Sequence, residues 1–156
     1  TMKKIVSFSG LFLLLFSIFT SLQAQESASY YFRATIESSF DETVTRTKAS
    51  LKEQGFGIIT EIEMDKTLKE KLDNVEMKRY TILGACNPKF AYETLQIEEN
   101  IGLFLPCKVL VKEISENETE VVMVNPSELM KMLGNDELTG VADKVTSRFQ
   151  KALNDL

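Results

Sequence analysis

Residues 80–97, YTILGACNPKFAYETLQI, decide the fold because they join a buried strand directly to a helix. The run from Tyr80 to Ala85 is apolar at consecutive positions, which is typical of a central strand covered on both faces. Asn87 is a favoured helix N-cap, and Pro88 fits the first helical turn, where its missing N–H costs nothing. The sequence therefore predicts a central strand followed by a helix over Pro88–Ile97.

The segment before this strand has the pattern strand, helix, strand. Apolar and polar residues alternate from Tyr30 to Glu37, as in a half-buried strand. Helical spacing then predicts a helix over Phe40–Gln54, and Gly55 supplies a stop. A second strand follows from Phe56 to Met64. This βαβ opening predicts that at least part of the sheet is parallel.

The segment after residue 97 predicts a hairpin followed by helices. A strand over Cys107–Ser115 and a strand over Thr119–Val124 form the hairpin. A short helix begins at Asn125 and Pro126. The last helix has an apolar stripe, which we expect to pack on the sheet, although the same pattern can serve a dimer interface. Its residues are Leu138, Val141, Val145, Phe149 and Ala152.

These elements place the chain in the α+β class. We expect a single mixed β-sheet of about five strands packed against helices, with a βαβ opening and a C-terminal hairpin followed by helices. Residues 25–156 are a typical length for one domain with one hydrophobic core. The sequence therefore predicts one α+β domain over 25–156.

Residues 1–24 have the pattern of a secretory signal peptide. Lys3 and Lys4 precede an apolar run from Ile5 to Phe19, and Ala24 is a small residue before polar Gln25. The run would reach about 22 Å as a helix, which is short for a membrane core of about 30 Å. We therefore expect cleavage, export to the periplasm or outside the cell, and no stable membrane anchor in the mature chain.

The composition excludes several kinds of site. The chain contains no histidine, which removes Ser-His-Asp and Cys-His catalysis and the commonest metal ligand. A net charge of −5 argues against binding to nucleic acid. The pairs Glu61–Glu63 and Glu98–Glu99 are expected to lie on the solvated surface. We therefore predict no catalytic residues, no metal and no cofactor, and favour a non-enzymatic domain.

Two short motifs resemble those of a known family. The first is Gly84-Ala85-Cys86-Asn87-Pro88, followed by Ala91, and the second is residues 101–109, IGLFLPCKV. Together they resemble the domain of unknown function 302 family over about Tyr30–Leu156. The resemblance implies a compact sheet-and-helix fold and frequent dimers, so a homodimer is an expectation. It implies no established activity.

The two cysteines allow three interpretations. Cys86 ends one predicted strand and Cys107 begins another, so their sulfurs meet if these strands are adjacent and antiparallel. In an oxidising compartment the first interpretation is a disulfide. The second is a pair of buried, inert thiols, and the third is a redox-active or ligand-binding pair.

The candidate ligand or redox site comprises Cys86, Asn87, Pro88, Pro106 and Cys107. The apolar segment from Ile101 to Leu105 is expected to be core, with the wall of a ligand pocket as the alternative. The leading hypothesis is an exported, non-enzymatic domain that binds a small molecule or a protein partner at this edge. The alternative is a thiol-dependent redox or sulfur-handling protein that uses Cys86 and Cys107.

Overall fold

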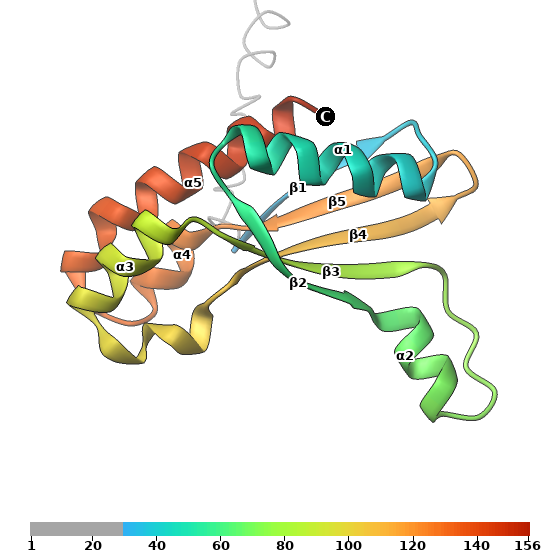
Figure 1. Cartoon of the computed structure of the whole chain (residues 1–156), viewed down its shortest axis with the longest axis horizontal. Coiled ribbons are helices and arrows are strands. Elements are labelled where there is room, and N and C mark those ends of the chain that lie inside the picture. Colours follow the sequence, from blue (N-terminus) through green and yellow to red (C-terminus); the bar gives the residue numbers. More distant parts are fainter. Residues whose placement is uncertain (1–29) are drawn as a thin grey trace, which may run out of the picture.

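The computed structural model describes residues 30–156, and its centre is a five-stranded sheet in the order β1-β5-β4-β3-β2 (Figure 1). The predicted signal peptide, residues 1–24, lies outside the described residues. The strands are β1 (Tyr31–Ile36), β2 (Gly57–Glu63), β3 (Tyr80–Cys86), β4 (Cys107–Ser115) and β5 (Glu118–Val124). The helices are α1 (Phe40–Glu53), α2 (Met64–Lys71), α3 (Pro88–Ile97), α4 (Pro126–Lys131) and α5 (Thr139–Asn154), with 3₁₀ helices η1 (Glu99–Phe104) and η2 (Asp136–Leu138).

The expectation of a mixed, partly parallel sheet is wrong. Every hydrogen-bonded strand pair is antiparallel, and β1 and β2 lie at opposite edges of the sheet. The pairings still leave β1 and β2 running in the same direction, as the βαβ pattern requires. The strands β5, β4 and β3 separate them, because their buried apolar positions favour the centre of the sheet. The rest of the predicted α+β architecture is confirmed.

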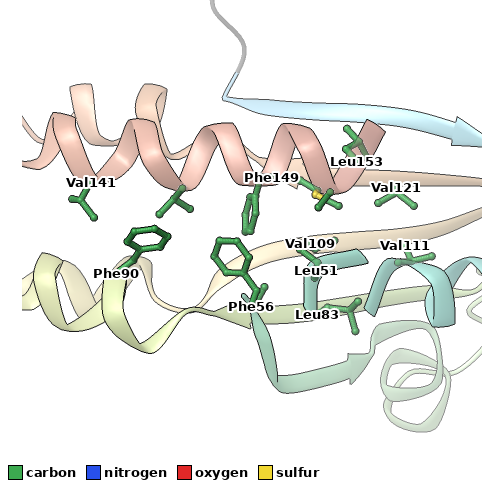
Figure 2. Close-up of a cluster of buried hydrophobic side chains, with 14 of the residues drawn as sticks. Leu51, Phe56, Leu83, Phe90, Val109, Val111, Val121, Val141, Phe149 and Leu153 are labelled. Carbon is green, nitrogen blue, oxygen red and sulfur yellow. The ribbon is translucent and has the colours of Figure 1, made fainter. Parts of the chain in front are cut away.

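The core lies between one face of the sheet and helices α1 and α5 (Figures 1 and 2). Alternate residues of the central strands point to this face, as the two-residue period of a strand requires. Leu83, Val109 and Val121 are fully buried there beneath Leu51 of α1 and Phe149 of α5. The predicted packing of the α5 stripe inside the domain is confirmed. Burial of each such side chain contributes about 1.5–3 kcal/mol to stability.

The end of the sheet where β3 stops and β4 starts carries the remaining helices. Asn87 accepts hydrogen bonds from the backbone N–H groups of Lys89 and Phe90, at 3.1 and 3.2 Å, and so begins α3. The apolar segment after α3 forms η1 and leads through Pro106 into β4. The start of α4 follows β5 directly at the same end. These turns place α3 and α4 beside α5, with η1 next to α3 (Figure 1).

Candidate functional site

A cavity of about 220 Å³ lies at this end of the sheet. Its walls come from α3 and η1, from α4, and from the first half of α5, with the ends of β3, β4 and β5 below. Phe90 points from α3 toward Val141 of α5 across this region (Figure 2). Most lining residues are apolar, and two of them, Leu103 and Phe104 of η1, are 86% and 39% exposed.

Short side chains explain why the space stays open. Ala85 of β3, Ala91 of α3 and Ala142 of α5 line three different walls of the cavity. Each places only a methyl group beside the cavity, whereas larger side chains such as Leu51, Val121 and Phe149 fill the packed half of the domain. A close-packed interior has few voids larger than a water molecule. The cavity is therefore a distinct feature of this end of the domain.

The structure brings most of the predicted site residues to this cavity. Cys86, Asn87 and Cys107 line it. Pro88 starts α3 and is exposed, and Pro106 lies beside β3, where its Cγ would be 2.6 Å from a Cβ added to Gly84. Neither proline lines the cavity. The prediction that β3 and β4 are adjacent and antiparallel, with both cysteines at one edge, is confirmed.

Both cysteines are free thiols, so the structure does not contain the disulfide that was the first interpretation. The register explains why: Cys107 pairs with Ala85, one residue before Cys86. Consecutive strand residues point to opposite faces, so Cys86 is not directly opposite Cys107. Burial is the main cause that raises the pKa of Cys107 to about 11, with a further increase from Cys86 and a smaller decrease from Lys108. Cys107 is therefore a neutral thiol near pH 7.

Asn87 holds the fold together rather than being free for a ligand. Besides capping α3, its amide donates a hydrogen bond to the backbone carbonyl of Gly55, at 2.9 Å. Gly55 has φ +85°, a left-handed conformation that suits glycine at the end of α1. Arg148 of α5 donates to the carbonyl of Gln54 and lies over the ring of Phe90. These contacts tie α1, α3 and α5 together beside the cavity.

Sequence reasoning missed the α4 and α5 walls of the cavity. Leu129, Met130 and Val145 line it, and their helical spacing is that of an ordinary core stripe. The segment from Ile101 to Leu105 was expected to be core, and this is correct only for Ile101, which is buried. Ala91 and Ala142 are small, but so is Ala152 on the packed half of α5, so no local signal in the sequence distinguishes this cavity wall from a packed face.

Lys108 is a further cavity residue that the predicted site did not include. It lines the cavity at the start of β4, and its Nζ donates a hydrogen bond to the carbonyl of Pro106, at 2.8 Å. Thr94, a polar residue on the α3 wall, donates its hydroxyl to the carbonyl of Phe90, at 2.6 Å.

The acidic pairs lie on the surface, as expected. Glu61 pairs with Lys48 and Glu63 pairs with Lys66. Glu98 caps η1 through the backbone N–H of Asn100. Within residues 30–156, no group of three or more potential metal ligands comes together. No helix in that range is both long and apolar enough to cross a membrane.

The fold and the site define an α+β domain with an antiparallel sheet, a covered face and an apolar cavity at one end. The chain belongs to the DUF302 family, a domain of unknown function whose model matches residues 32–156. Its fold is similar to the crystal structure of an uncharacterized conserved DUF302 protein from Bacillus stearothermophilus. The two share 29% identity, with a TM-score of 0.75, over 82% of this chain and 98% of the other. No curated protein matches the chain.

Proposed function

We propose that this chain is an exported, non-enzymatic binding protein that holds a small apolar molecule in the cavity between α3, η1, α4 and α5. The observation that carries the proposal is the cavity itself, whose walls come from α3, η1, α4 and α5 and whose lining side chains are mostly apolar. Ligand sites are typically concave and apolar, with a few polar groups. Export rests on the signal-peptide pattern of residues 1–24.

The volume of the cavity limits the size of the molecule. An engineered apolar cavity of about 150 Å³ accepts benzene, which has six carbon atoms. By proportion, a cavity of about 220 Å³ accommodates about nine non-hydrogen atoms. A small molecule suits this cavity better than a protein partner does, because a stable protein interface needs about 800 Å² of surface on each side.

The chemistry of Cys107 argues against this sulfur as the reactive atom of the redox alternative. A redox-active cysteine reacts as its thiolate, which requires a lowered pKa. The pKa of Cys107 is raised to about 11, so this sulfur keeps its proton at physiological pH. Cys107 therefore suits a dry cavity wall better than a reactive centre.

Filling the cavity tests the proposal. Ala142→Leu adds three carbons to the α5 wall, and Ala49→Leu makes the same change on the exposed side of α1. The wild-type protein, purified from its own host and observed by native mass spectrometry, should carry an extra non-covalent mass. It should also bind 1-octanol saturably in an NMR titration. Both signals should disappear in Ala142→Leu and remain in Ala49→Leu.

Measuring the stability of each variant alongside binding separates a filled cavity from an unfolded protein. The larger side chain of Ala142→Leu would occupy a void, so unfolding in urea should show a free energy equal to or above that of the wild type. A folded wild-type protein that carries no extra mass and shows no saturable octanol binding would overturn the proposal. Equal binding by wild type and Ala142→Leu would also overturn it, because the ligand would then lie elsewhere.

A further inference from the structure

We infer that the molecule held in the cavity has an anionic end that Lys108 receives, so that the site fits a medium-chain carboxylate of about eight carbons. This inference rests on the proposed function and adds the chemical class of the ligand. It is carried by the charge, the hydrogen-bond groups and the size of the cavity.

The first observation is the charge of the lining. Among the described residues that line the cavity, Lys108 carries the only formal charge and none is an aspartate or glutamate. A cationic ligand would find no partner in this lining, and a neutral one would leave the ammonium group unused. An anion near Lys108 gains a charge-assisted hydrogen bond.

The second observation is that Lys108 has no carboxylate partner within residues 30–156. Several other lysines of the domain do have one, for example Lys48 with Glu61, and Lys112, four residues along the same strand, with Glu120. The Lys108 ammonium instead donates to the carbonyl of Pro106. An ammonium group has three donors, so it keeps donors for a ligand.

The third observation concerns the other polar groups of the lining. The amide of Asn87 is used by Gly55 and by the start of α3, and the hydroxyl of Thr94 donates to its own helix. The thiol of Cys107 remains, and a neutral thiol is a weak donor. The high pKa of Cys107 keeps its proton in place. The ammonium of Lys108 and the thiol of Cys107 are therefore the side-chain donors left for a ligand, and they suit a ligand end that accepts hydrogen bonds.

Lys108 also borders a hollow of about 330 Å³ on the uncovered face of the sheet, together with Arg33, Lys112 and Glu120. Arg33 and Lys112 both pair with Glu120 there. These two cations are already occupied, and the lining of this hollow is more polar than that of the cavity. The apolar cavity is therefore the better place for the chain of an anionic ligand, with its charged end at Lys108.

The chain length follows from the volume. The cavity accommodates about nine non-hydrogen atoms, and octanoate has about ten, of which the carboxylate oxygens would lie beside Lys108. Longer chains would exceed the volume of the cavity. We therefore choose octanoate, 1-octanol and octylamine as probes, since they share the chain and differ in charge.

Calorimetric titration of the full folded protein at pH 7 compares the three probes. Octanoate should bind at least about fivefold more tightly than 1-octanol, and octylamine should bind more weakly than either, as expected for one partly exposed ion pair. Lys108→Gln should remove the preference for octanoate and leave octanol affinity unchanged. Lys89→Gln is the matched control, because Lys89 is exposed nearby on α3 and does not line the cavity.

The outcomes separate this inference from the proposed function. If octanol and octanoate bind equally, or if Lys108→Gln and Lys89→Gln weaken octanoate to the same extent, the inference is wrong while the binding cavity stands. Tighter binding of octylamine than of octanoate would also overturn the inference. If none of the three probes binds saturably to the folded wild type, both the inference and the proposed function fail.

Discussion

The two halves of helix α5 cover very different interiors. At its C-terminal half, Phe149 is fully buried against the ring of Phe56, at a centroid distance of 4.7 Å, and against the sheet (Figure 2). At its N-terminal half, Val141 and Ala142 face a cavity of about 220 Å³. One amphipathic helix therefore covers a packed core at one end of the sheet and the cavity at the other end.

This difference suggests separate roles for the two ends of the sheet: the packed end supplies stability, and the cavity end supplies the proposed binding site. Close packing at the α1 end supplies most of the dispersion and hydrophobic contacts that hold the domain. The end beneath α3, η1 and α4 gives up part of those contacts and is held instead by hydrogen bonds such as those of Asn87 and Arg148. We expect substitutions at the packed end to affect stability most, and substitutions at the hollow end to affect binding most.

The largest expected effect on stability comes from comparing two single variants, each of which removes one phenyl ring from one end of the domain. Phe149→Ala should lower the free energy of unfolding by about 3–5 kcal/mol, because the ring is surrounded by packed atoms. Phe90→Ala should cost less, about 2 kcal/mol, because one side of this ring already faces the cavity. Urea unfolding at pH 7 measures both. Equal losses would mean that the two ends are packed alike.

A smaller effect is expected at Gly84, where the central strand approaches the hollow end. A Cβ at this position would lie 2.1 Å from Oγ1 of Thr60 and 2.6 Å from Cγ of Pro106. Gly84→Ala should therefore cost about 1–3 kcal/mol, because the ring of Pro106 cannot rotate out of the way. Gly102→Ala is the matched control, since no atom lies within 4 Å of its added Cβ. A Gly84→Ala protein as stable as Gly102→Ala would contradict the close contact.

Much of this fold could be predicted from local signals in the sequence. The cap at Asn87 and proline at the first turn gave α3 its observed bounds, Pro88–Ile97, and the hairpin alternation gave β4 as Cys107–Ser115. The neighbours of β1 could not be predicted, because alternation reports which face of a strand is buried and not which strand lies beside it. The parallel pairing expected from the βαβ pattern failed for this reason.

Only part of the candidate site could be predicted, because local patterns do not report which elements lie side by side. Cys86, Asn87 and Cys107 stood out because they lie at predicted strand ends, and the structure places all three at the cavity. Leu129 and Val145 did not stand out, because an apolar residue that lines a void has the same spacing as one that packs. Whether an apolar face is filled depends on the volumes of side chains from four different elements, which local patterns do not report.

The smallest expected effect tests whether the hollow end excludes water. Burial raises the pKa of Cys107 from 9.0 in the unfolded chain to about 11 in the folded domain. A raised folded-state pKa stabilises the fold fully below pH 9, and this contribution is lost as the pH rises from 9 to about 11. The free energy of unfolding in urea should fall across this pH range in the wild type and in Cys86→Ala, and should fall less in Cys107→Ala.

The same pKa shift should slow alkylation of Cys107 by iodoacetamide at about pH 8 by about a hundredfold relative to the unfolded chain, because only the thiolate reacts. Rapid alkylation of Cys107 in the folded protein would mean that water reaches the thiol, and the two ends of the domain would then differ in packing without differing in polarity.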